Sequence, residues 1–170
     1  MRTHMQQNEE PVAPDVPLMP ASLTFETDTP KDGWWTIHVK IQEECFKDHS
    51  IVPWVENNNK NRRFFEFSIE CSAVCDPIPS LHEFIYNIAS GSRIYEKWYV
   101  DEEGNNCLFE SWYFSHSLRQ IRIETFLNFE GEKVYNLLVD KVNFLLALEK
   151  AYCEFGKKGG WQLFGLHYWS

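Results

Sequence analysis

The carboxylates most able to do chemistry in this chain stand together in YEKWYVDEEGNNCLFESW, residues 95–112. Asp101, Glu102 and Glu103 are consecutive, and Gly104 follows them. Closely spaced carboxylates can ligate Ca²⁺ or act as a general acid and base. A calcium loop, however, needs oxygen ligands spread over about a dozen residues, and strand-like residues resume soon after the glycine. The composition instead predicts a hairpin turn over residues 101–105, with glycine in a left-handed or bulge position.

The histidines and cysteines match no ligand or nucleophile motif. None of the six histidines has a partner at HExxH spacing. The five cysteines fit neither a disulfide framework nor a zinc signature, and we expect all of them to be free thiols. We therefore predict no metal, no cofactor and no catalytic residue. A site assembled from residues distant in sequence stays open, because such partners meet only in the folded chain. The cysteines are Cys45, Cys71, Cys75, Cys107 and Cys153.

The charge of the chain narrows the class of partner. The net charge is −9, from 25 acidic and 16 basic residues. Such a chain is repelled by nucleic acid and by anionic lipid, and it attracts basic proteins. We interpret NNNKNRRFF, residues 57–65, as a surface loop leading into a strand rather than as a nucleic-acid site. Without a signal peptide or an apolar run approaching the ~18 residues of a membrane span, a cytoplasmic location is expected.

Hydrophobic periodicity predicts alternating strands and two amphipathic helices. Period-2 stretches indicate half-buried strands, and apolar residues at i, i+3, i+4 and i+7 indicate helices. Short links between the later strands favour an antiparallel meander. The expected fold class is α+β, a twisted antiparallel sheet of about five or six strands with two helices on one face. The expected strands are 34–42, 64–72, 93–100, 106–114, 121–129 and 134–139, and the expected helices are 78–90 and 141–156.

The N-terminal segment has a proline period of its own. Pro11, Pro14, Pro17 and Pro20 recur every third residue, and polyproline II has three residues per turn. We expect residues 1–22 to form a disordered or extended tail. Residues 23–170 would then form a single α+β domain.

One face of the predicted sheet carries polar and aromatic residues that the helices would not cover. The aromatic content is 16%, which is high for this length, and partly exposed rings are typical of binding surfaces. We predict that the acidic turn, together with two residues of the following strand, forms a docking surface for a basic protein. The predicted binding residues are Asp101, Glu102, Glu103, Glu110 and Trp112.

Three stretches give the chain a resemblance to known proteins. DPIPSLHEFIYNIASG, WYVDEEGNNCLFESW and VDKVNFLLALEKAYCEF resemble small acidic bacterial proteins of unassigned function. These include immunity proteins of polymorphic toxin and contact-dependent inhibition systems. The resemblance covers about residues 64–156. It implies a toxin domain as the partner, and it carries over no site residue.

Two kinds of function remain in view at this point. The absence of a catalytic motif favours a non-enzymatic protein-binding module, and the resemblance suggests an immunity protein that neutralises a bacterial toxin domain. An interaction protein of another kind fits the same features. The alternative is an enzyme or small-ligand-binding protein with a site assembled from scattered residues.

Overall fold

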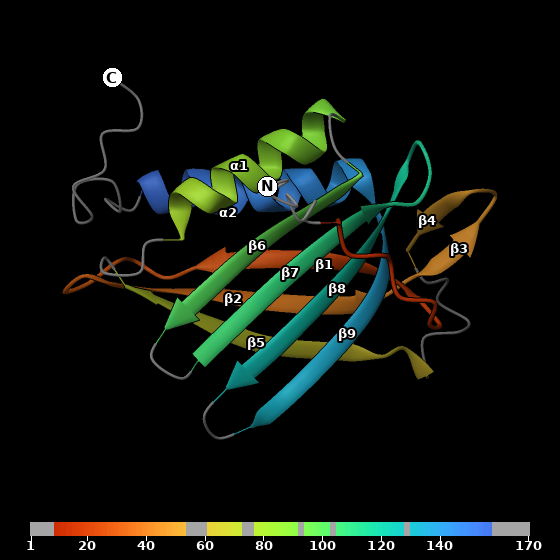
Figure 1. The fold of residues 1–170 in the computed structure, drawn as a ribbon. Coiled ribbons are helices and arrows are strands. Elements are labelled where there is room, and N and C mark those ends of the chain that lie inside the picture. Colours follow the sequence, from red (N-terminus) through yellow and green to blue (C-terminus); the bar gives the residue numbers. More distant parts are fainter. Residues whose placement is uncertain are drawn as a thin grey trace, which may run out of the picture.

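A computed structural model of the chain describes residues 9–53, 61–72, 77–91, 94–102, 105–127 and 130–157. Seven strands form one large sheet, two short strands form a hairpin beside it, and both helices lie on one side of the large sheet (Figure 1). The α+β class is therefore confirmed. The elements are β1 Met19–Thr27, β2 Trp34–Glu43, β3 Cys45–Lys47, β4 Ser50–Val52, β5 Phe64–Ser72, α1 Ile78–Ser90, β6 Tyr95–Glu102, β7 Asn105–Tyr113, β8 Leu118–Leu127, β9 Gly131–Asp140 and α2 Lys141–Lys157.

The large sheet consists of two antiparallel halves. Its strand order is β5-β2-β1-β9-β8-β7-β6. Strands β6 to β9 form the expected antiparallel meander, and β1, β2 and β5 form the other half. The halves meet where β1 runs parallel to β9 over two residue pairs, Met19 with Leu137 and Pro20 with Leu138. The sheet is thus mixed and seven-stranded, so the expectation of five or six antiparallel strands is corrected.

Three strands are not predicted by the sequence pattern. Strand β1 begins at Met19, so the last four residues of the expected tail, 19–22, are part of the sheet. Its stretch MPASLTFET alternates buried and more exposed residues, but proline and polar residues weaken the pattern. Strands β3 and β4 are three residues each and form a hairpin within the expected long connection. Such short strands leave too little periodicity to recognise.

The expected hairpin between β6 and β7 is present and tighter than expected. The strands pair up to Glu102 and Asn105, and Asp101 faces Asn106. Asp101 and Glu102 therefore belong to β6 rather than to the turn. Glu103 and Gly104 lie outside the described residues.

The helices begin and end largely as the sequence indicates. Gly91 ends α1 with a φ of 65°, in the left-handed region that glycine adopts without strain. Asp140 caps α2, because its Oδ1 accepts a hydrogen bond from the backbone N–H of Asn143 at 2.9 Å. In the first turn of α1 the hydroxyl of Ser80 donates to the carbonyl of Pro77 at 3.0 Å. Neither helix is long and apolar enough to cross a membrane.

The core lies between the two halves of the sheet and under the helices. Phe25 of β1 packs against Phe109 of β7, with ring centroids 6.0 Å apart, and against Phe144 of α2 at 6.4 Å. Trp35 of β2 packs against Phe155 of α2 at 4.2 Å. These buried rings join both halves and α2 into one hydrophobic cluster. No disulfide joins the described cysteines, Cys45, Cys71, Cys107 and Cys153; Cys75 lies outside the described residues.

Candidate functional site

The sheet face opposite the helices, here called the outer face, is where the predicted binding residues meet. Across β6, β7, β8 and β9 the strand register arranges its side chains in four rows. The rows are counted from the end of the sheet where β7 connects to β8. The strap row is Tyr95, Trp112, Gln120 and Leu138, and the charge row is Lys97, Glu110, Arg122 and Asn136. The ring row is Tyr99, Leu108, Glu124 and Val134, and the rim row is Asp101, Asn106, Phe126 and Glu132.

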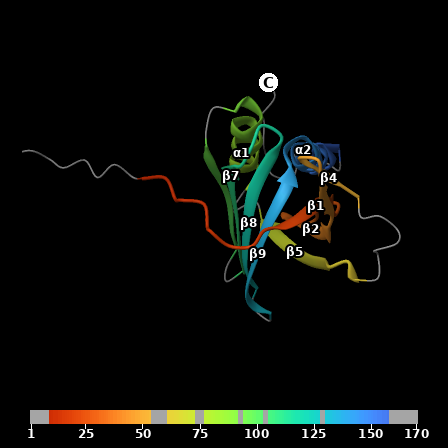
Figure 2. The ribbon, with the colours of Figure 1, turned by 90° about the vertical axis from the view of Figure 1, so that its right-hand side faces the viewer.

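The strap row is covered by the chain's own N-terminal segment, residues 9–18, here called the strap. The indole Nε1–H of Trp112 donates to the carbonyl of Pro11 at 2.8 Å, and the amide of Gln120 donates to the carbonyl of Pro14 at 3.0 Å. Trp112 is only 4% exposed. Figure 2 shows the strap crossing the sheet on the side away from the helices. The expectation that Trp112 is exposed is therefore wrong, since it assumed that nothing covers this face.

The charge row is held together by its own hydrogen bonds. Glu110 accepts from the hydroxyl of Tyr95 at 2.8 Å and from Arg122 at 3.0 Å, and Arg122 also donates to Glu124 at 2.7 Å. Burial first, and then the hydrogen bond from its hydroxyl to Glu110, raise the pKa of Tyr95. Burial lowers the pKa of Arg122, but its bonds to the two carboxylates raise it overall. Glu110, one of the predicted binding residues, is thus buried among its partners rather than exposed to a docking protein.

The ring and rim rows form the accessible part of the outer face. Tyr99 is 47% exposed, Phe126 is 49% exposed and Val134 is 42% exposed. Asp101 and Glu132 stand exposed beside them. Of the predicted binding residues, Asp101 therefore lies at the edge of this surface; Glu102 follows it on β6, but the side chain of Glu102 and all of Glu103 are outside the described residues.

Sequence reasoning missed the exposed rings. Tyr99 and Phe126 belong to different strands, 27 positions apart, and only the pairing of β6 with β7 and of β7 with β8 brings them onto neighbouring rows. The sequence did carry a local signal for their exposure, because the neighbours of each ring along its strand are more buried than the ring itself. Tyr99, for example, stands between the buried Trp98 and Val100. The row to which each ring belongs could not be read without the register.

A buried polar group lies on the inner side of the same half. Arg119 of β8 donates to the hydroxyl of Ser111 at 2.9 Å and to the carbonyl of Ile94 at 3.4 Å. Burial lowers the pKa of Arg119, and the nearby charge of Glu96 partly opposes that shift. Glu96 accepts from the side-chain amide of Asn87 on α1 at 3.2 Å. This cluster fastens α1 to the sheet and has the character of a structural contact.

On the outer face of the half formed by β1, β2 and β5, one histidine has polar contacts at both ring nitrogens. The Nδ1 atom of His38 on β2 lies 2.8 Å from the hydroxyl of Ser68 on β5, and its Nε2 atom lies 3.0 Å from Asp28. Lys40 lies 3.5 Å from Glu26 on the same face. His38, Ser68 and Lys40 line an open hollow of about 530 Å³. This is the arrangement nearest to a nucleophilic site in the part of the chain that the structure describes.

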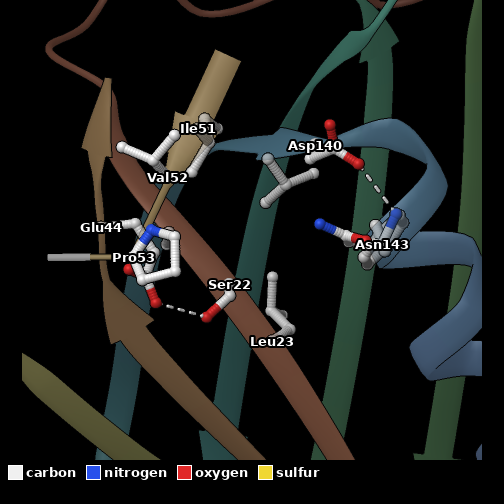
Figure 3. Close-up of a pocket in the computed structure, with 11 residues that line it drawn as sticks. Ser22, Leu23, Glu44, Ile51, Val52, Pro53, Asp140 and Asn143 are labelled. Atoms are coloured by element: carbon white, nitrogen blue, oxygen red, sulfur yellow. Dashed lines mark hydrogen bonds between the residues drawn. The ribbon is translucent and has the colours of Figure 1, made fainter. Parts of the chain in front are cut away.

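A smaller hollow of about 180 Å³ lies between β1, the β3–β4 hairpin and the start of α2 (Figure 3). Leu23, Val52 and Phe144 supply apolar walls. Glu44 at its edge accepts hydrogen bonds from Ser22 at 2.9 Å and from Arg62 at 2.7 Å. An engineered apolar cavity of about 150 Å³ holds benzene, so this hollow has room for a group of similar size.

In the part of the chain that the structure describes, no three histidine, cysteine, aspartate or glutamate side chains are grouped so that they could hold a metal ion. Comparison with known proteins gives no further assignment: no protein-family model, no curated protein and no solved structure matches this chain.

Proposed function

We propose that this chain is a protein-binding module that docks a basic partner on the ring and rim rows of its outer face. The observation that carries the proposal is a pair of exposed rings, Tyr99 and Phe126, on a sheet surface that no described segment covers, beside the carboxylates Asp101 and Glu132. Aromatic side chains supply most of the binding energy in protein interfaces, and a surrounding polar rim excludes water.

Charge selects the kind of partner. On these two rows the exposed or partly exposed charged groups are Asp101, Glu124 and Glu132, all carboxylates. Lys97, on the neighbouring row, is exposed as well. Together with the net charge of −9, the carboxylates favour a basic protein. A secreted toxin domain is one such partner, and a chain that neutralises it would be an immunity protein.

The test uses the full chain as bait against a lysate of the native host. The double variant Tyr99→Ala with Phe126→Ala should lose the partner that the unchanged chain retains. The matched control is Phe46→Ala with Tyr86→Ala, because those rings are 47% and 65% exposed but lie on β3 and on α1, away from the outer face. A partner retained equally by all three baits would place the interface elsewhere.

Binding kinetics with the purified partner then distinguish the contribution of the rings from that of the charges. Loss of a ring that acts as a hot spot should speed dissociation by about tenfold or more. Neutralising Asp101, Glu102 and Glu103 should instead slow association and flatten its salt dependence, because screening limits exposed charges to ~8 Å at ~0.15 M salt. Surface plasmon resonance at several salt concentrations measures both. If the captured partner is a toxin, co-expression of the chain should restore growth to cells that produce it.

A second candidate function is acyl transfer at Ser68, and it rests on the hydrogen-bonded chain Asp28–His38–Ser68. In such a step the Ser68 hydroxyl oxygen would attack an ester carbonyl and pass its proton to Nδ1 of His38, while Asp28 holds the Nε2–H. The alcohol would leave with that proton, and water would release the acid by the same sequence. Lys40, in the same hollow, would face the developing oxyanion.

A fluorophosphonate probe decides this second candidate. The probe should label Ser68, and Ser68→Ala and His38→Ala should both abolish labelling. Ser50→Ala serves as the control, because that exposed hydroxyl hydrogen-bonds only to a backbone carbonyl among the described contacts. An unlabelled wild-type chain rules out acyl transfer at Ser68 and leaves the docking proposal standing.

A further inference from the structure

The strap is held to the sheet through its backbone carbonyls. Trp112 and Gln120 are directly paired across β7 and β8, and each donates one side-chain hydrogen bond to the strap. The two acceptors are the carbonyls of Pro11 and Pro14, three residues apart. The strap side chains are more open to solvent: Val12 is 89% exposed and Val16 is 41% exposed.

The spacing of the two accepted bonds is that of polyproline II. This helix has three residues per turn and no internal hydrogen bonds, so its carbonyls at every third position face one side and are available to donors. The strap sequence EEPVAPDVPL has proline at that period. Domains that recognise proline-rich peptides use aromatic-lined grooves for this preformed backbone.

Two of the receiving side chains, Tyr95 and Trp112, are also held by contacts within the sheet. The ring of Tyr95 lies against the ring of Trp112, with centroids 5.3 Å apart. The hydroxyl of Tyr95 is held by Glu110, which Arg122 holds in turn. Two aromatic rings and two donors therefore stand in a defined arrangement on β6, β7 and β8, supported by a row of charges next to it. Such preorganisation reduces the entropy cost of binding.

We propose that Tyr95, Trp112 and Gln120 of the strap row form a recognition site for proline-rich peptides in the polyproline II conformation, and that the chain's own strap occupies it. The ligand class is an extended segment with prolines three residues apart, read through its carbonyls at positions i and i+3. Because the strap is covalently attached, a peptide from another protein binds only by displacing it. This site is separate from the docking surface of the ring and rim rows.

The test keeps the full chain and loosens the strap with Pro11→Gly, Pro14→Gly and Pro17→Gly. Glycine removes the restriction to polyproline II without adding a side chain. Indole N–H resonances in ¹H–¹⁵N spectra report the result, with the Trp112 signal assigned through Trp112→Phe. The Trp112 signal should shift and exchange faster with water. Trp98 is the matched internal control, because its indole also donates to a proline carbonyl, that of Pro77 at 3.2 Å, but inside the core.

Adding the synthetic peptide EEPVAPDVPL should then return the Trp112 signal of the glycine variant toward its wild-type position in a saturable way. Adding Gln120→Ala to that variant should lower its affinity for the peptide by roughly three- to tenfold, which is the effect of losing one neutral hydrogen bond. A scrambled peptide without the three-residue proline period should bind clearly more weakly. Equal binding of the two peptides, or no shift of the Trp112 signal at millimolar peptide, overturns the proposal.

A milder variant keeps the proposal testable if the triple variant loses its fold. Pro14→Gly alone should raise the exchange rate of the Trp112 indole while leaving that of Trp98 unchanged. A Trp112 indole as protected from exchange as that of Trp98 in this variant shows a strap fixed as part of the core, which also overturns the proposal.

Discussion

On the outer face of β6–β9, the exposed rings Tyr99 and Phe126 stand beside carboxylates, whereas the centre of the outer face of β1, β2 and β5 carries polar side chains bonded to one another. In the second case His38 is engaged at both ring nitrogens and Lys40 lies near Glu26. The exposed rings of Trp34 and Phe64 stand only at opposite ends of that face. Polar groups that satisfy each other gain little from a partner, while exposed rings gain from burial.

The contrast concerns the outer faces only, because the inner faces share one core. Phe25→Ala removes the ring of β1 that touches both β7 and α2. We expect a loss of about 3–5 kcal/mol in the free energy of unfolding, as for other buried phenylalanines. Urea denaturation measures the change, and Phe46→Ala, at a 47% exposed ring, should change it by no more than about 0.5 kcal/mol.

Two buried thiols report whether the halves unfold together in that experiment. Cys71 lies in β5 and Cys107 in β7, and both are at most 1% exposed. Burial also raises the pKa of the Cys107 thiol, which makes it less reactive. In the folded chain the exposed Cys153 should react first with a thiol reagent. Protection of Cys71 and Cys107 should be lost at the same urea concentration; separate midpoints would mean that the halves are independent units.

The outer faces of the two halves should also differ in how much an ion pair contributes to the free energy of unfolding. Arg122→Ala should cost about 1–3 kcal/mol, because it leaves Glu110, whose side chain is 12% exposed, without its cation. Lys40→Ala on the other half should cost at most about 1 kcal/mol, since both partners are exposed and 3.5 Å apart. Equal losses in thermal or urea unfolding would contradict the distinction drawn between the faces.

A change on the inner face of β8 should act in the opposite direction. The hydroxyl of Thr125 is buried, at 1% residue exposure, and has no hydrogen-bond partner among the described residues. Thr125→Val keeps the shape and removes the buried polar atom, so we expect stability to rise by about 1 kcal/mol. Thr24→Val, at an exposed position on the outer face of β1, is the control and should be nearly neutral.

The smallest expected effect is a pH dependence at the edge of the β1, β2 and β5 half. The hydrogen bond from Arg63, 2.6 Å away, lowers the pKa of Glu43. A carboxyl with a lowered pKa stabilises the fold above its unfolded pKa, and this contribution disappears as the pH falls through the folded value. Glu43→Gln should remove that part of the acid sensitivity, at most about 1 kcal/mol for so exposed a partner. Identical acid-unfolding curves for the two proteins would show that the pair contributes nothing.

The sequence predicted the elements better than their arrangement. Strand 64–72 and helix 78–90 match the structure at both ends, because alternation, the Asp-Pro break and Gly91 mark them locally. The parallel contact of β1 with β9 was missed, since it joins residues more than 100 positions apart and leaves no local signal. The predicted face of Glu110 and Trp112 was right, but their exposure was not. Alternation tells which side a residue faces, whereas coverage by the strap depends on tertiary contacts.

The two-residue contact between β1 and β9 has a consequence for how the chain is made. Of the described strands, β1 is the first to leave the ribosome and β9 is the last, so one of the two neighbours of β1 in the sheet is absent for most of synthesis. Until β9 arrives, the edge of β1 stays unpaired, and unpaired edges promote association with other chains. The late arrival of β9 and α2 therefore makes nascent chains dependent on rapid completion, and pauses before residue 131 should increase aggregation during translation.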